Sequence, residues 1–286
     1  MSGAARTAAS RLAREPHALA PDLFAGRTVL VSGGGSGIGM AIAWLFGRLG
    51  ARVAICGRSA ERLEQAAADM TAHGIDIFCI PTDIRDEEAV ARLFDAVTGR
   101  FGSLDALVNN AGGQYPQAAA DIVPKGWRAV VETNLTGSWL MMQAAATHWI
   151  GASRPGSIVN IVASNERGMP GIIHSSAARA GVINASRTAA VEWAPHGVRV
   201  NCVAPGLIET PGLDVYPDEA RAGFSSANPQ RRTGDPWEVA QAVAFLSSPA
   251  ASFVTGATLV IDGGGALSGE LWTHRPSPYD RGKTEQ

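Results

Sequence analysis

Glycines crowd a short segment near the amino terminus and could let a phosphate approach the backbone. Gly33, Gly37 and Gly39 follow the apolar, β-branched run 28–31, and an apolar segment with helical spacing comes after them. A strand, a glycine turn and a helix in this order present backbone N–H groups and a helix N-terminus to an anion, because no side chain blocks the approach. The segment predicts a pyrophosphate site, and the alternative is a tight strand–helix turn without a ligand.

The residues after the second apolar run indicate which nucleotide would fit. Gly57, Arg58 and Ser59 stand there, and none of them is a carboxylate. Dinucleotide sites that take an unphosphorylated ribose place an acid at this point, whereas an arginine suits a 2′-phosphate. We therefore expect NADP(H) rather than NAD(H). Asp83, after the third apolar run, would accept a hydrogen bond from the adenine amino group or would cap the helix that follows.

The elements that would position these residues alternate regularly along the chain. The strands are continuous apolar runs, which is typical of strands buried on both faces, and amphipathic helices separate them. Strands are expected at 27–32, 51–56, 75–80, 104–109, 157–162, 198–203 and 257–261, and helices at 37–49, 60–72, 86–100, 124–149, 175–194 and 236–246. This order predicts an α/β fold with a doubly wound, parallel, seven-stranded sheet and ligands at the carboxyl ends of the strands.

A single domain is expected to span the central part of the chain. Residues 26–265 contain every expected strand and helix without a linker or a repeat, and the connection 206–235 is long enough for a functional lid. Residues 1–25 carry three arginines before the first acid, Glu15. We expect a loose arm there, and the alternative is a mitochondrial presequence. Residues 266–286 form a polar tail.

Composition narrows the class of protein further. The chain has 286 residues, 46% of them hydrophobic, and a formal charge of −2, so no overall basic field favours nucleic acid or an anionic membrane. It has no apolar run of about 18 residues, which argues against a membrane span. Cys56, Cys79 and Cys202 lie in or beside apolar runs without metal-binding spacing. We therefore expect packed thiols, no metal and a cytoplasmic protein.

Several motifs together resemble the short-chain dehydrogenase/reductase family over about 26–265. They are Gly33-xxx-Gly37-Ile38-Gly39, Asp83-Ile84, Asn109-Asn110-Ala111-Gly112, Asn134 in Glu-Thr-Asn-Leu-Thr-Gly, Arg199-Val-Asn-Cys-Val-Ala-Pro-Gly206 and Ile261-Asp-Gly-Gly264. The resemblance implies a Rossmann fold, a bound nicotinamide dinucleotide and a homodimer or homotetramer. The expected nucleotide contacts are Gly33, Gly35, Ser36, Gly37, Ile38, Gly39, Arg58, Ser59, Asp83, Ile84, Asn110, Ala111, Gly112, Arg179, Pro205, Gly206, Ile208 and Thr210.

The usual proton donor of this family is absent from its expected place. Family members pair a tyrosine with a lysine one helical turn later, and the ammonium lowers the pKa of the phenol. Here Ser175 and Arg179 stand at those positions, and Ser164 lies two residues beyond the place of the usual serine. The only Tyr-xxx-Lys pair, Tyr279 to Lys283, lies in the polar tail and is attributed to chance. The resemblance therefore implies a site with no phenol beside the nicotinamide.

This departure is similar to one branch of the family, the peroxisomal trans-2-enoyl-CoA reductases and their bacterial relatives. Some of those relatives are named citronellol or citronellal dehydrogenases. The segments 109–114 and 174–182 carry the likeness. The related 2,4-dienoyl-CoA reductases also lack the Tyr-xxx-Lys pair. They hold a lysine at the Arg179 position and a tyrosine at the Ser164 position, so this chain departs from them as well.

The likeness to this branch implies reduction of a C=C bond conjugated to a thioester, on CoA or a carrier, or to a ketone. Hydride added to the β-carbon leaves an enolate oxygen that hydrogen-bond donors stabilise, and water can protonate the α-carbon. Arg179 can hold hydroxyl or carboxamide groups but cannot donate a proton near neutral pH. The expected catalytic residues are Asn134, Ser164, Ser175 and Arg179, and Tyr115 is either a further donor or a packing residue.

Two other functions stay open. An alcohol or carbonyl oxidoreductase acting on a terpenoid-like substrate would need a proton donor that the expected site lacks. A protein that keeps the nucleotide pocket without hydride transfer would be a non-redox catalyst or a binding protein. Ser175 could instead cap its helix, Asn134 could only hold a helix kink, and His174 is expected to be structural. A CoA substrate would favour basic residues at the pocket mouth, for which Arg167, Arg221, Arg231 and Arg232 are available.

Overall fold

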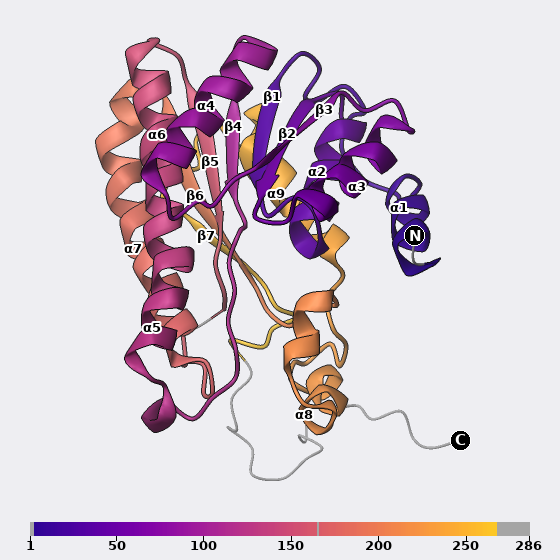
Figure 1. The fold of residues 1–286 in the computed structure, drawn as a ribbon, viewed down its shortest axis with the longest axis vertical. Helices are drawn as coiled ribbons and strands as arrows, with labels where there is room; N and C mark the ends of the chain where they lie inside the picture. The colour runs from indigo at the N-terminus through magenta and orange to yellow at the C-terminus, as the bar shows by residue number, and fades with distance from the viewer. Residues whose placement is uncertain (1–2, 165, 268–286) are drawn as a thin grey trace.

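Seven parallel strands form the centre of the molecule. The computed structural model describes residues 3–164 and 166–267, and its sheet has the order β3-β2-β1-β4-β5-β6-β7 (Figure 1). The expected doubly wound sheet is confirmed, and each expected strand and helix begins and ends within two residues of its observed bounds. The strands are β1 (Thr28–Ser32), β2 (Arg52–Gly57), β3 (Ile77–Pro81), β4 (Ala106–Asn109), β5 (Gly156–Ile161), β6 (Val198–Pro205) and β7 (Thr258–Ile261).

Helices cover both faces of the sheet. On one face lie α2 (Gly37–Arg48), α3 (Ala60–Thr71) and α9 (Pro236–Ser247), and on the other lie α4 (Glu87–Phe101), α6 (Gly137–Gly151) and α7 (Ile173–Trp193) (Figure 1). The expected long helix at 124–149 is present without a break in the chain of helical turns. Its middle turn (Glu132–Thr136) is π-helical and separates α5 (Pro124–Val131) from α6. The short α8 (Asp218–Ala222) lies in the connection 206–235, beyond the carboxyl ends of the strands (Figure 1).

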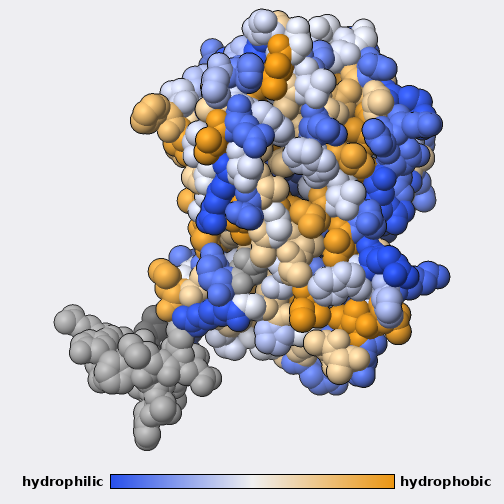
Figure 2. Space-filling model, turned by 90° about the vertical axis from the view of Figure 1, so that its left-hand side faces the viewer, coloured by the Kyte–Doolittle hydropathy of each residue, from blue (hydrophilic) through white to orange (hydrophobic). Residues whose placement is uncertain are grey.

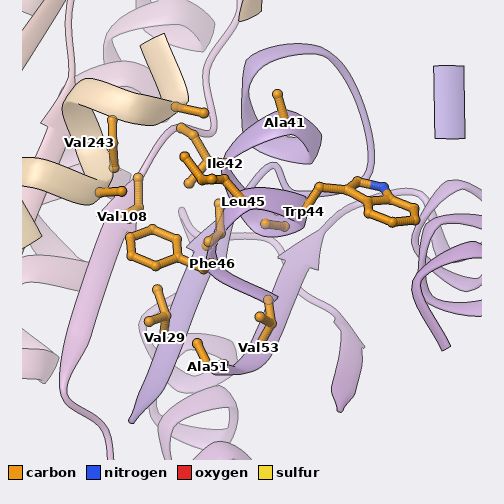
Figure 3. Close-up of a cluster of buried hydrophobic side chains, with 14 of the residues drawn as sticks. Val29, Ala41, Ile42, Trp44, Leu45, Phe46, Ala51, Val53, Val108 and Val243 are labelled. Atoms are coloured by element: carbon orange, nitrogen blue, oxygen red, sulfur yellow. The ribbon is translucent and has the colours of Figure 1, made fainter. Parts of the chain in front are cut away.

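Helix α2 is buried on several sides and packs in the same core as β1 and α9. Ile42, Leu45 and Phe46 are fully buried and lie among Val29 of β1 and Val243 of α9 (Figure 3). Burying a side chain of this size contributes about 1.5–3 kcal/mol relative to leaving it exposed. This packing fixes α2 against the sheet, and so it fixes the glycine turn from which the helix begins.

The amino-terminal arm is not loose, so that expectation was wrong for its described part. It begins with helix α1 (Gly3–Leu12), and the side chain of Leu12 is buried in the same core as α2. Arg48 of α2 donates hydrogen bonds to two backbone carbonyls of the arm, at 2.7 and 2.6 Å. Arg11 forms an ion pair with Asp235 at 2.6 Å. The arm is thus tied both to α2 and to the residue that caps α9.

The three cysteines follow the expectation of packed thiols only in part. Cys56 and Cys202 are buried free thiols as expected, whereas Cys79 is only half-buried. Burial raises the pKa of the Cys56 thiol to about 12, which keeps it protonated. Across the described residues, no helix combines the length and the apolar character that a membrane crossing requires. The Tyr279 to Lys283 pair lies outside the described residues.

Candidate active site

The glycine turn at the end of β1 is closely packed. Gly33 has a φ of +68°, a conformation that favours glycine. A Cβ atom at Gly39 would overlap the carbonyl oxygen of Gly33 and the Nδ2 atom of Asn110. Sequence reasoning passed over Gly34, where a Cβ atom would overlap the side chain of Ile55. The turn can therefore keep this shape only with glycine at these positions.

The amino terminus of α2 faces the connection that follows β6. Ser36 precedes the first turn of α2 and its side chain makes no capping hydrogen bond. Thr210, in the connection after β6, lies over Gly37, where an added Cβ would come within 3.4 Å of it. Uncapped N–H groups at a helix start suit an anion. The residues present therefore fit a pyrophosphate between the turn and Thr210.

The ends of β2 and β3 carry the groups expected near the adenosine. Arg58 is exposed, and Ser59 caps α3 by accepting from the backbone N–H of Arg62 at 3.4 Å. The hydrogen bond from the Arg85 guanidinium lowers the pKa of Asp83 to about 2, and the positive charge of Arg58 adds to this effect. Asp83 is therefore ionised and close to Arg58. It does not cap α4, whose capping residue is Asp86.

The end of β4 is joined to β1 through Ser32. The Ser32 hydroxyl accepts from the backbone N–H groups of Asn110 and Ala111, at 3.1 and 3.0 Å. Gly112 follows, and a Cβ atom there would overlap the Nη2 atom of Arg179. Two of the expected nucleotide contacts, Gly112 and Arg179, are thus in direct contact with each other. Ile84, another of the expected nucleotide contacts, is buried against Gly137 at the start of α6.

The residues after β6 also lie at this edge of the sheet. Pro205 ends β6, and Gly206 packs so closely on Asp262 that an added Cβ would lie 2.8 Å from the Cβ of that residue. Ile208 is buried and pairs with Gly234 in a short parallel bridge. These contacts fix both ends of the connection 206–235 and leave its middle, with α8, over the carboxyl ends of the strands (Figure 1).

Asn134 is buried in the π-helical turn and holds the loop after β4. Its Nδ2 donates to the carbonyl of Gly113 at 3.0 Å, and its Oδ1 accepts from the N–H of Gly113 at 2.9 Å. The same Nδ2 donates to the Ser175 hydroxyl at 3.2 Å. π-Helical turns occur often at functional sites. Asn134 and Ser175, predicted independently as site residues, are therefore in direct contact.

A tyrosine hydroxyl lies beyond this cluster, linked to it through Gln114, on the connection after β6 and not on α7. The Ser175 hydroxyl donates to Oε1 of Gln114 at 2.8 Å, and Nε2 of Gln114 donates to the hydroxyl of Tyr216 at 2.7 Å. Ser175 lies inside α7 and does not cap it. Burial raises the pKa of Tyr216, so its phenol is neutral at physiological pH. Gln114 and Tyr216 are the members of the cluster that sequence reasoning missed.

Arg179 brings a buried cation to the same edge of the sheet. Its side chain is on α7, one turn after Ser175, and the residue is only 8% exposed. Nη1 donates to the carbonyl of Ile161 at 2.8 Å, and no carboxylate within 3–164 and 166–267 pairs with the guanidinium. Burial lowers its pKa to about 10, which still leaves it charged at neutral pH. It can therefore attract hydroxyl, carbonyl or anionic groups of a ligand.

Ser164 does not join the hydrogen bonds around Ser175. Its hydroxyl lies 3.0 Å from a carboxylate oxygen of Asp262 and 3.3 Å from one of Glu166, and its single hydrogen is donated to these acid groups. It lines a separate cavity of about 230 Å³ that Gly206 and Asp262 also line. Of the four expected catalytic residues, the structure brings Asn134 and Ser175 into contact and places Arg179 beside them, while the side-chain hydrogen bonds of Ser164 go elsewhere.

The side chains of Tyr115 and His174, two further candidates, pack against each other. The hydroxyl of Tyr115 lies over Gly126, and its ring meets His174 edge-on at 4.7 Å. The N–H of Ser175 donates to Nδ1 of His174, and burial lowers the pKa of this histidine, which keeps it neutral. Of the arginines considered for CoA, Arg221 and Arg232 are paired with acids.

The fold and the residues at the carboxyl edge of its strands define an oxidoreductase of the Rossmann type. The family model described as Enoyl-(Acyl carrier protein) reductase matches residues 33–266, and the chain belongs to the short-chain dehydrogenase/reductase family. A nicotinamide cofactor is general in this family. The resemblance noted from the motifs is thereby confirmed.

Similar proteins carry the names of both reductases and dehydrogenases. A probable 2,4-dienoyl-CoA reductase of Bacillus subtilis is 38% identical over 243 residues, which cover 83% of this chain and 96% of the relative. The cis-4-hydroxycyclohexanecarboxylate dehydrogenase of Sinomonas cyclohexanicum is 43% identical, with coverage of 85% and 98%. The solved structure of a citronellol catabolism dehydrogenase from Pseudomonas aeruginosa PAO1 has a TM-score of 0.79 and 43% identity, and the match covers 87% of this chain and 98% of that one.

Proposed function

We propose that the protein is an NADP(H)-dependent reductase that acts on the C=C bond of an α,β-unsaturated acyl thioester or of a related enone. One observation carries the proposal: the helix that usually supplies a tuned phenol and an ammonium supplies a buried serine and a buried arginine. The hydrogen of Ser175 is committed to Gln114, and Arg179 stays charged. Such a site can hold an oxyanion but lacks an acid with a pKa near neutrality on this helix.

The residues would divide the work between the cofactor and the substrate. The bound nicotinamide supplies the hydride. The glycine turn, Thr210 and Arg179 would bind and orient the nucleotide, and Asn134 would keep the loop after β4 in place through Gly113. The substrate oxygen would accept hydrogen bonds while it carries the charge of an enolate. The α-carbon then takes its proton from water, so the protein needs no proton transfer of its own.

A panel of substrates tests this function. Purified protein with NADPH is expected to oxidise the cofactor when crotonyl-CoA, a longer trans-2-enoyl-CoA or a 2,4-dienoyl-CoA is added, and the saturated or partly saturated product is identified by mass spectrometry. The reductase names among the relatives support this panel. Tight NADPH binding without turnover of any enoyl, alcohol or aldehyde substrate would instead indicate a protein without hydride transfer.

An alcohol or carbonyl oxidoreductase is the second candidate function. The two relatives at 43% identity are named as dehydrogenases, one for a cyclic hydroxy acid and one in citronellol catabolism. Oxidation of an alcohol needs a base that accepts its proton, and burial raises the pKa of Tyr216 away from that role. Reduction of NADP by citronellol or a hydroxy acid, with no NADPH oxidation by enoyl-CoA, would favour this candidate over the reductase.

The cofactor preference is expected to depend on Arg58. Replacing it with aspartate (Arg58→Asp) removes a cation near the expected 2′-phosphate and adds a repelling charge. Loss of a charge-assisted hydrogen bond of roughly 1.5–3 kcal/mol would raise the Kd of NADPH by about 10- to 100-fold. The Kd of NADH, measured in the same fluorescence titration, is expected to change little.

Arg92→Asp is the matched control for this substitution. Arg92 is exposed on α4, where it faces Glu88, and the substitution changes the charge of the protein by the same amount. It is expected to leave both dissociation constants unchanged. An unchanged NADPH affinity in Arg58→Asp would contradict the NADP(H) assignment.

We propose that the chain assembles as a homodimer or homotetramer. Phe245 of α9 and Leu259 and Val260 of β7 are exposed apolar side chains. On the opposite side Trp139 and Trp193 stack on the surface of α6 and α7, with ring centroids 6.3 Å apart. Figure 2 shows this second face, where apolar side chains gather across the middle and polar ones along an edge. Such apolar surface is typical of an interface between subunits.

Light scattering at micromolar concentration measures the oligomeric state. We expect a mass of two or four chains, and we expect Val260→Glu to lower it because a buried charge would be unpaired at the contact. A monomer in the unmodified protein would exclude the assembly.

A further inference from the structure

The hydrogen bonds around Ser175 run in one direction, and the backbone fixes that direction. The side-chain amide of Asn134 faces both the N–H and the carbonyl of Gly113, at 2.9 and 3.0 Å. An amide oxygen can only accept and an amide nitrogen can only donate, so Asn134 has one possible orientation. Its nitrogen therefore points to Ser175 and makes the Ser175 hydroxyl an acceptor at 3.2 Å.

The direction continues outward from Ser175. This residue is 1% exposed, so its own hydrogen needs a protein acceptor, and Oε1 of Gln114 lies 2.8 Å away. The nitrogen of the same amide then points to Tyr216 and donates to its hydroxyl oxygen at 2.7 Å. Successive bonds of this kind polarise one another. At the end of the chain the Tyr216 oxygen is an acceptor, and its hydrogen has no acceptor among the described residues.

Tyr216 reaches the cluster from the opposite side of the site. It follows a short helical turn (Pro211–Val215) in the connection after β6, the same connection whose Thr210 lies over the glycine turn. Its ring packs edge-on against Phe224 with centroids 5.5 Å apart, which limits the positions of the hydroxyl. Asn134, Gln114 and Ser175 come from α5–α6, the β4 loop and α7. The phenol therefore stands between the connection and the helices.

We propose that Tyr216 donates its hydroxyl hydrogen to the substrate oxygen that carries the negative charge of the enolate. This inference rests on the proposed reductase function. Hydride forms a bond to the β-carbon, the electron pair of the C=C bond moves toward the carbonyl, and the oxygen gains charge. The substrate is reduced and the nicotinamide oxidised, while Tyr216 keeps its proton and gives only a hydrogen bond. Water supplies the proton that the α-carbon finally takes.

The electrostatics of Tyr216 suit a donor better than an acid. Its burial raises the pKa of the phenol, so the hydrogen stays on the oxygen across the neutral range. The Gln114 nitrogen that donates to the phenol oxygen increases the polarity of the remaining O–H bond. The structure thus supplies, from a connection far along the chain, the phenol that α7 lacks. In this role the Tyr216 phenol is a hydrogen-bond donor to an oxyanion.

Tyr216→Phe tests the inference, with Tyr115→Phe as the matched control. Removing one donor from an oxyanion costs about 100-fold in rate. We expect kcat with crotonyl-CoA and NADPH to fall by about that factor, while KM and the Kd of NADPH stay within about 2-fold. Tyr115→Phe removes a hydroxyl that lies over Gly126 and is expected to keep the unmodified rate. Melting temperatures show whether both variants are folded.

A second variant keeps Tyr216 but reverses its hydrogen bond. In Gln114→Glu the amide nitrogen becomes a carboxylate oxygen, so Tyr216 would donate its hydrogen to Glu and lose it for the substrate. The rate is expected to fall about as far as in Tyr216→Phe, and the double variant is expected to be no slower than either one. A residue with only a packing role would not produce this non-additivity.

The outcomes separate this inference from the function on which it rests. If the unmodified protein oxidises NADPH with enoyl-CoA and Tyr216→Phe keeps a rate within about 3-fold, the inference fails and the function stands. Additive losses in the double variant would also overturn it, because the two residues would then act separately. If the unmodified protein reduces no enoyl thioester or enone, both the function and the donor role of Tyr216 are overturned.

Discussion

Arg179→Met is expected to abolish most of the turnover while leaving the fold at least as stable. The guanidinium is buried, makes a hydrogen bond to the Ile161 carbonyl and has no carboxylate partner in the described part of the chain. A buried charge without a counterion costs several kcal/mol. Methionine fills a similar volume against Gly112 without that cost. Relief of the buried charge offsets the roughly 1–3 kcal/mol that the unpaired Ile161 carbonyl costs. We therefore expect the free energy of unfolding to stay equal or rise by about 1 kcal/mol, and kcat/KM to fall by about 100-fold or more.

Arg199→Met is the matched control because Arg199 is a half-buried arginine with a different role. Its guanidinium donates to the carbonyls of Leu246 and Ser248, at 2.7 and 3.3 Å, and so joins β6 to the end of α9. Removing it leaves the Ser248 carbonyl without this donor and the Leu246 carbonyl with only the Ser157 hydroxyl at 3.5 Å. A buried carbonyl that loses its partner costs about 1–3 kcal/mol. Denaturant unfolding is expected to show a loss for Arg199→Met and none for Arg179→Met, while the rates show the reverse. A large loss of stability in Arg179→Met would mean that its charge has a structural role.

The strands were predictable because burial on both faces produces a simple apolar pattern in the sequence. A parallel sheet covered by helices needs continuous apolar runs, and each such run became a strand close to its expected bounds. The amino-terminal arm has no such pattern. It is held by contacts with residues far along the chain, such as Arg48 and Asp235, and contacts at such separations have no periodic signal. The sequence of the arm therefore predicted a segment that does not pack on the domain.

The site divides in the same way between local and distant determinants. Ser175 and Arg179 were found because they stand at the positions of the family's tyrosine and lysine, one helical turn apart in the sequence. Gln114 and Tyr216 were missed because they lie on two loops and their contact spans 102 positions. Ser164 was included for its position near the end of β5, yet its hydroxyl donates to Asp262, 98 positions away. Which loop residue meets which is decided by the packing of the loops and not by local spacing.

Gly39→Ala is expected to weaken both the fold and the binding of nucleotide, because the turn has no room for one methyl group. A Cβ atom there would overlap the Gly33 carbonyl oxygen and Nδ2 of Asn110, and the first of these is backbone. Asn110 in turn donates to the carbonyl of Ser32 at 3.0 Å, so a shift would spread to β1. Overpacking of this kind costs about 1–3 kcal/mol or more. We expect a loss of about 3 kcal/mol in stability and a Kd for NADPH raised by about 100-fold.

Gly99→Ala is the same chemical change at a position where it is expected to raise the stability of the fold. Gly99 lies within α4, and a Cβ atom there would meet nothing within 4 Å. Alanine is favoured over glycine in a helix interior by about 0.5–1 kcal/mol, so this variant is expected to melt slightly higher and to bind NADPH normally. The two variants measured side by side, by thermal unfolding and by NADPH titration, separate the close packing of the turn from the general effect of replacing glycine. Normal NADPH affinity in Gly39→Ala would contradict the placement of the nucleotide on this turn.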